Sequence, residues 1–176
     1  GILREPEESI RRADIVVFTK TNKKLSDIPA LKDYLGKING RLIFLEAVHR
    51  PKRLYNIRER TTLDLGSVKG KRAMLLSSIG DPDYFEETVR DLGARVLGHM
   101  RFSDHYDYKP SDIDDIIRRM ERERYDFLIT TEKDSVKLVR LGLSLARARL
   151  AFLIVEMELT SGREALIDRL HRLYSD

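Results

Sequence analysis

Cysteine is absent from this chain of 176 residues. Disulfide scaffolds, cysteine-ligated zinc sites and cysteine nucleophiles are therefore excluded, and the composition is compatible with a reducing cytoplasm. No run of 18 apolar residues occurs, so we expect no transmembrane helix. Residues 1–12, GILREPEESIRR, also lack the apolar stretch of a signal peptide.

A concentrated charge of one sign is missing too. The 33 Lys and Arg residues against 29 Asp and Glu residues leave a net charge of only +4, and the signs alternate in segments such as 118–124. We interpret the densest basic group, residues 49–53 (HRPKR), as a solvated loop, with phosphate contacts as the alternative. A nucleic-acid partner is therefore not expected.

Several catalytic motifs are also missing. Residues 66–72 (GSVKGKR) place three residues between their glycines where a Walker A loop has four, and Arg72 follows the lysine in place of Ser or Thr. Neither Gly-x-Gly-x-x-Gly nor Gly-x-Ser-x-Gly occurs. These residues therefore predict no phosphate loop and no serine nucleophile elbow.

The apolar residues that are present, 41% of the chain, are grouped in short continuous runs. Runs of this kind are typical of strands that are buried on both faces. The expected strands are 14–19, 42–48, 73–77, 127–130 and 150–155, with a weaker strand at 95–102 and short edge strands within 55–63.

Helical signals separate these runs. Asp81 is a cap, Pro82 suits the first helical position, and apolar residues then recur at helical spacing until Gly93. Capping boxes that begin at Ser111 and Ser161 predict two further helices. The alternation of strands and helices predicts an α/β fold, a mostly parallel sheet with helices on both faces, in one domain over residues 1–176.

Ligands bind beyond the carboxyl ends of the strands in such a sheet. This rule directs attention to the loops 19–27, 77–82, 101–109 and 130–134.

The loop after the 95–102 strand contains the first candidate site. His105 lies between two carboxylates, Asp104 and Asp107, and histidine can transfer a proton near neutral pH. The alternatives are a surface histidine and a histidine that caps the next helix. A metal site that joins His105 to His99 and Asp104 matches no usual ligand spacing.

Two further junctions carry polar groups. Thr131 can cap a helix, and Lys133 can hold a phosphate or pair with a carboxylate, with simple helix capping as the alternative. Residues 77–82 (SSIGDP) precede a helix N-terminus, where free backbone N–H groups can bind an anion. The alternative for this segment is a tight turn between strand and helix.

Four segments resemble one family in the same order along the chain. They are GILREP with the later RAD (1–6 and 12–14), SSIGDPDYF (77–85), FSDHYDY (102–108) and TTEKDSVKL (130–138). They resemble signature segments of the tetraacyldisaccharide 4'-kinases, P-loop kinases of lipid A biosynthesis. The last two segments are the most specific.

The resemblance covers nearly all of the chain, but only the second half of the family's length. It implies the C-terminal part of an ATP-dependent kinase that phosphorylates the 4'-hydroxyl of the tetraacyl glucosamine disaccharide precursor of lipid A. The implied cofactors are ATP and Mg²⁺, bound mainly by the N-terminal half. The implied partners are the lipid A disaccharide precursor, that half, and the cytoplasmic face of the bacterial inner membrane, and the chain alone is expected to be inactive.

The resemblance also implies roles for individual residues. His105 occupies the position of the family's catalytic-site histidine, which assists the catalytic Asp of the first half, and Asp104 stands beside it. Glu5 matches an acid near the nucleotide and the metal, with Arg4 beside it. The residues expected to support the site are Gly80, Thr131, Glu132, Lys133 and Asp134.

Two other functions remain open at this stage. One is a non-catalytic α/β module that binds a nucleotide or a phosphosugar. The other is a nucleic-acid-binding domain centred on residues 50–60. A Walker A motif upstream of Gly1 in the same reading frame would favour the kinase.

Overall fold

A computed structural model describes residues 5–22, 27–142 and 148–174. The chain divides into two compact units. Unit 1 comprises Gly1–Arg50 and Glu156–Asp176, and unit 2 comprises Pro51–Val155. Two long strands, β2 and β7, contribute residues to both units. One cooperative domain over residues 1–176 therefore stays a prediction.

The sheet is mixed but mostly parallel. Its strands are β1 (Ile15–Thr19), β2 (Ile43–Asn56), β3 (Thr61–Leu63), β4 (Arg72–Ser77), β5 (Arg95–Arg101), β6 (Phe127–Thr131) and β7 (Arg149–Ser161). Their order is β1-β2-β7-β6-β4-β5, and β3 pairs with β2. The pairs β1–β2, β4–β5, β4–β6 and β6–β7 are parallel, while β2–β3 is antiparallel. The predicted α/β class is confirmed.

Strand β2 is longer than the sequence predicted, because it continues past Val48 to Asn56. The basic residues 49–53 therefore lie in a strand and not in a loop, so that prediction was wrong. Arg50 donates to Glu158 through both Nε and a terminal nitrogen, at 3.2 and 3.1 Å. Charged side chains on a strand face can form such cross-strand pairs, which a local apolar pattern does not show.

The helical segments are η1 (Glu7–Arg12), α1 (Ile28–Ile38), η2 (Leu65–Val68), α2 (Pro82–Asp91), α3 (Pro110–Glu123), α4 (Glu132–Arg140) and α5 (Arg163–Leu173). None in the described part of the chain is long and apolar enough to cross a membrane. Asp81 caps α2 as predicted and accepts from the Tyr84 N–H at 3.0 Å.

Both predicted capping boxes are misplaced. Helix α3 begins at Pro110, one residue before Ser111, and the Lys109 N–H donates to Asp112 at 2.7 Å. Proline suits the first helical position, so it sets the start there. Ser161 is the last residue of β7, and Gly162 precedes α5 with a φ of +83°, a left-handed conformation that glycine adopts readily.

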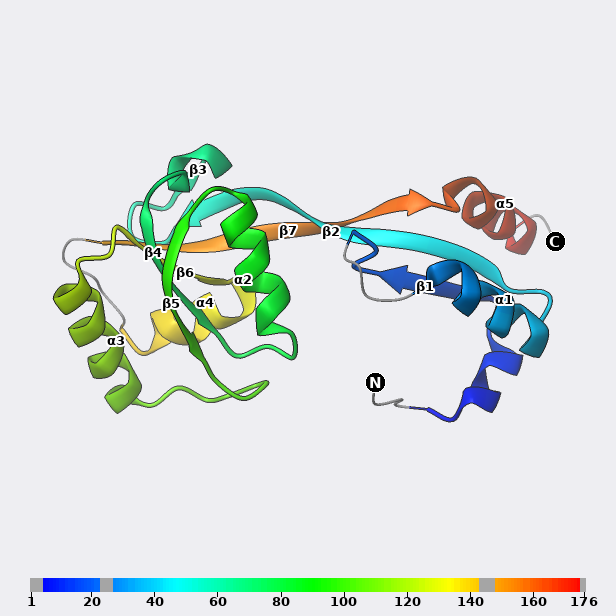
Figure 1. Cartoon of the computed structure of the whole chain (residues 1–176), viewed down its shortest axis with the longest axis horizontal. Helices are drawn as coiled ribbons and strands as arrows, with labels where there is room; N and C mark the ends of the chain where they lie inside the picture. The colour runs from blue at the N-terminus through cyan, green and yellow to red at the C-terminus, as the bar shows by residue number, and fades with distance from the viewer. Residues whose placement is uncertain (1–4, 23–26, 143–147, 175–176) are drawn as a thin grey trace. The chain divides into compact units, whose positions relative to one another are not determined.

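The core of unit 2 lies on both faces of the sheet. Alternate residues of β4 enter different apolar clusters, Ala73 and Leu75 with residues of α2, and Met74 and Leu76 with residues of α3 and α4. Figure 1 shows α2 and α3 on opposite sides of these strands. A continuous apolar run can form a strand only when both faces are covered. Helices on both faces, as predicted, are therefore present in unit 2.

Candidate functional site

The carboxyl ends of three strands in unit 2 meet. In the parallel ladders Ser77 is paired with Arg101, and Leu76 with Thr130. The segments that follow β4, β5 and β6 are therefore held at one edge of the sheet. We call residues 77–82, 102–109 and 130–134 together the loop site. The predicted loop 19–27 follows β1 and belongs to unit 1, and part of it lies outside the described residues.

Asp134 is a fully buried carboxylate that joins two segments of the loop site. It accepts hydrogen bonds from the backbone N–H of Ser78 at 2.9 Å and from the Ser78 hydroxyl. It also accepts from Thr131 Oγ1 at 2.8 Å, while its own N–H donates to that hydroxyl at 3.1 Å. Thr131 thus caps α4 as predicted, and Asp134 points into the protein as a structural clamp.

Two backbone amides at and just after the segment 77–82 have side-chain partners within the protein. The Ser78 N–H, one of the amides that the sequence left open for an anion, is occupied by Asp134. The Tyr84 N–H is occupied by Asp81. An internal carboxylate therefore takes the place of an external anion at Ser78, as the tight-turn interpretation requires.

Asp104 and Lys133 link the second and third segments. Lys133 Nζ lies 3.2 Å from Asp104 Oδ1. The ammonium of Lys133, which donates to this carboxylate, lowers the pKa of Asp104 below its ordinary value. A Cβ atom at Gly80 would lie 3.8 Å from Asp104 Oδ2, so the first segment also approaches this pair. Of the two partners predicted for Lys133, the structure shows the carboxylate.

His105 is held by its backbone and leaves its ring exposed. Its φ is +62°, a left-handed conformation in which histidine occurs more often than most residues. Its N–H donates to the Ser78 carbonyl at 3.3 Å. The side chain is 76% exposed, and Nε2 lies 3.9 Å from Asp104 Oδ2. The backbone of His105 is therefore held by a hydrogen bond, while its imidazole ring is accessible from outside.

Sequence reasoning missed Lys137, which reinforces the same loops from α4. Lys137 Nζ donates to the Tyr106 carbonyl at 2.7 Å and lies 3.5 Å from Ser78 Oγ. It also lies 5.8 Å from the centre of the Tyr108 ring. Burial and the nearby Asp134 carboxylate raise the pKa of the Tyr108 phenol. The spacing from Asp134 to Lys137, nearly one helical turn, is the signal that could have revealed it.

The other predicted site residues make none of the contacts described above. Glu5 belongs to unit 1, where it accepts from Ser9 and forms a salt bridge with Arg12, and Arg4 lies outside the described residues. Glu132 is exposed on the first turn of α4. The described residues contain no group of three histidine or carboxylate side chains that could hold a metal ion.

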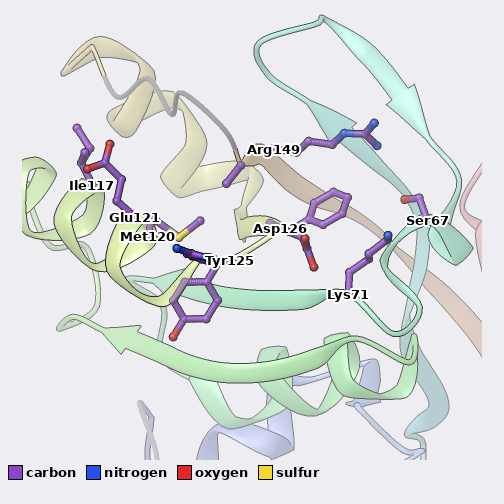
Figure 2. Close-up of a pocket in the computed structure, with 11 residues that line it drawn as sticks. Ser67, Lys71, Ile117, Met120, Glu121, Tyr125, Asp126 and Arg149 are labelled. Carbon is purple, nitrogen blue, oxygen red and sulfur yellow. The ribbon is translucent and has the colours of Figure 1, made fainter.

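A pocket of about 980 Å³ lies at the opposite ends of the same strands. Lys71 and Asp126 directly precede β4 and β6, and Arg149 begins β7. In Figure 2 the side chains of Met120 and Tyr125 lie on one side of this pocket, and Lys71 lies on the other. No residue predicted for the site lines it.

Comparisons with known proteins decide the family. The family model described as tetraacyldisaccharide-1-P 4'-kinase matches residues 1–174. This chain belongs to that family. A tetraacyldisaccharide 4'-kinase of Bdellovibrio bacteriovorus is 32% identical over 142 residues, which are 80% of this chain and 41% of that protein. The enzyme of the same name from Elusimicrobium minutum is 31% identical over 168 residues, 93% of this chain and 43% of that protein.

A solved structure supports the fold of this kinase-family chain. The apo form of LpxK from Aquifex aeolicus, crystallised in complex with ATP, superposes with a TM-score of 0.60 at 23% identity. The match covers 98% of this chain and 46% of the other. This chain therefore spans less than half of the length of the relatives it matches.

Proposed function

We propose that this chain is the C-terminal part of an ATP-dependent lipid kinase. The intact enzyme would transfer the γ-phosphate of ATP to the 4'-hydroxyl of the tetraacyl glucosamine disaccharide precursor of lipid A. The observation that carries the proposal is the family match over residues 1–174. The loop site supports it, because three of the four segments that resemble the family meet there.

His105 is the residue of this chain proposed to act in catalysis. Phosphoryl transfer depends mostly on positioning and on electrostatic stabilisation. His105 has a fixed backbone and an exposed ring, so it can reach a group outside this chain. We propose that it supports the catalytic Asp of the phosphate-loop half. Asp104 is held by Lys133 at 3.2 Å and lies beside the ring, with its Oδ2 3.9 Å from His105 Nε2.

The proposed partner of unit 1 is the phosphate-loop half of the kinase. None of η1, α1 and α5 contains a buried residue. Large exposed apolar side chains of unit 1 are Val17, Leu31, Tyr34, Met157, Ile167, Leu170, Leu173 and Tyr174. In the described part of the chain β1 ends the strand order, so its outer edge is open to another strand. Exposed apolar patches and open edges are typical of interaction surfaces.

ATP would be held mainly by that partner half, because the sequence here has no phosphate loop. Two candidate carboxylates do not suit a magnesium site: Asp134 accepts hydrogen bonds from Ser78 and Thr131, and Glu5 is paired with Arg12. The lipid disaccharide precursor and the cytoplasmic face of the inner membrane are further proposed partners. Their support is the family match and a net charge of +4, which suits an anionic lipid surface.

Reconstitution tests the proposal. The 176-residue chain, the intact kinase, and a mixture of the chain with the phosphate-loop half are each assayed for ATP-dependent phosphorylation of the disaccharide. We expect turnover by the intact enzyme, in the range of about 1–100 s⁻¹ typical of kinases, and none by the chain alone. An intact enzyme that leaves the disaccharide unphosphorylated would refute the function, and turnover by the chain alone would refute its division between two halves.

A further inference from the structure

A hydrogen-bonded chain of side chains, buried at Ser77 and His99, leads away from the loop site. It passes from Ser77 on β4 to His99 on β5 and to Glu86 on α2. We propose that His99 is a positioning residue of the kinase, which acts through Ser77 on the segment that holds His105. The inference rests on the proposed function for its activity readout, but its geometric part can be tested in this chain alone.

The first link joins Ser77 to His99. Ser77 Oγ lies 2.8 Å from His99 Nε2, and Ser77 is only 1% exposed. The ring of His99 is thus the side-chain partner of this buried hydroxyl, and an unpaired buried hydroxyl is costly. The His99 side chain is 4% exposed and packs edge-on against Phe85, with ring centres 6.0 Å apart. The ring has little room to turn.

The second link holds the other nitrogen of the ring. His99 Nδ1 lies 3.0 Å from Glu86 Oε2, and Arg101 Nε lies 3.2 Å from the same nitrogen. Arg101 also donates to Glu86 at 2.8 Å. Burial lowers the pKa of the His99 imidazole, which favours the neutral ring. Nδ1 can donate to Glu86 or accept from Arg101, and Nε2 then accepts from or donates to the Ser77 hydroxyl, so both tautomers of the neutral ring keep the link to Ser77.

The third link runs from Ser77 into the loop site. The Ser77 carbonyl accepts from the Phe102 N–H at 2.9 Å, and the next carbonyl, that of Ser78, accepts from the His105 N–H. A rotation of the Ser77 backbone would therefore disturb both bonds that hold the start of the histidine loop. His99 holds the Ser77 side chain in place. It thereby also limits movement of the neighbouring Ser78 carbonyl, which binds the His105 N–H.

Two substitutions at His99 separate positioning from packing. In His99→Gln the side-chain amide can reach the position of Nε2 and can bond to Ser77. In His99→Asn the amide can reach only the position of Nδ1 near Glu86. Ser77→Ala removes the other partner. Ser67→Ala is the matched control, because the Ser67 hydroxyl has no hydrogen-bond partner and lies near the opposite end of β4.

In the intact kinase we expect His99→Asn and Ser77→Ala to lower kcat by about 10- to 100-fold, the scale of a small misplacement of a catalytic group. KM should change by less than about twofold, because ground-state binding is not touched. His99→Gln should restore most of kcat, and Ser67→Ala should leave it unchanged. If the wild-type enzyme is active and His99→Asn has the same kcat, the inference is overturned.

Amide chemical shifts of the 176-residue chain give the second readout. We expect His99→Asn and Ser77→Ala to move the Ser78 and His105 amide signals, and we expect Ser67→Ala and His99→Gln to move them much less. Unmoved signals in His99→Asn would overturn the inference even if the wild-type kinase proved inactive. An inactive wild type with moved signals would refute the proposed function alone and leave the positioning link standing.

Discussion

The carboxylate of Asp134 accepts the backbone N–H of Ser78 across 56 positions of sequence, at 2.9 Å and with both residues buried. This contact ties the first turn of α4 to the segment after β4. The carbonyl of the same residue, Ser78, accepts the His105 N–H. The Asp134 carboxylate thus stabilises Ser78, the residue to which the backbone of the exposed His105 is hydrogen-bonded.

Asp134→Ala should destabilise the protein by about 1–3 kcal/mol, because it leaves the buried Ser78 N–H and hydroxyl without their acceptor. Urea unfolding measured by circular dichroism gives this free energy. Glu132→Ala, an exposed residue on the same turn, is the control and should change it by less than about 0.5 kcal/mol. Equal stability of Asp134→Ala and the wild type would contradict the clamp.

His105→Ala in the intact kinase should lower kcat by roughly 10²–10⁴, the usual scale for a proton-transfer group. KM should move little, because an interaction made only in the transition state leaves ground-state binding alone. The unfolding midpoint should stay near that of the wild type, since the ring is exposed. His105→Asn is a useful companion, because asparagine also tolerates the left-handed backbone. A lowered midpoint with normal kcat would instead make His105 a loop anchor.

Protonation of Glu86 should account for part of the stability that the protein loses in acid. Arg101 and Arg90 donate to this carboxylate and hold its pKa at about 2, against an ordinary value of 4.5. Because the folded-state pKa is the lower one, the stabilisation is fully present above about pH 4.5 and is lost as the pH falls toward 2. Glu86→Gln should therefore be less stable than the wild type at pH 7 and lose less stability between pH 5 and 2.

Thermal melts of both proteins across this pH range check the prediction. Glu121→Gln, which removes an exposed carboxylate, serves as the control for a change in net charge. If Glu86→Gln and the wild type lose stability in parallel over the window, the carboxylate is not the origin of the acid sensitivity.

The 176-residue chain should unfold cooperatively on its own. Unit 2 has an apolar cluster on each face of its sheet, and a domain of this size buries roughly 70% of its unfolded surface. Hydrogen exchange should be slowest in β4 and β6, whose residues are almost all buried. The chain should also bind an apolar dye through the exposed side chains of unit 1. A broad transition without cooperativity would contradict this expectation.

The sequence by itself determined the strands and helices whose signals are local. The continuous apolar runs of β4 and β6 predicted strands covered on both faces, and Asp81 with Pro82 predicted the start of α2. Thr131 was predicted as a cap because its partner, the Asp134 N–H, is only three residues away. Such features depend on chemistry within a few positions, so a local pattern is enough to identify them.

The tertiary structure decided everything that depends on parallel strands being brought into register. That register places Ser78 against Asp134 and Asp104 against Lys133, so an internal carboxylate occupies a backbone N–H that the sequence left open for an anion. It also pairs His99 with Ser77, a contact that sequence spacing gave no reason to expect. The physical reason is that side-chain hydrogen bonds act over about 3 Å in space, whereas these partners are 22 to 56 residues apart along the chain.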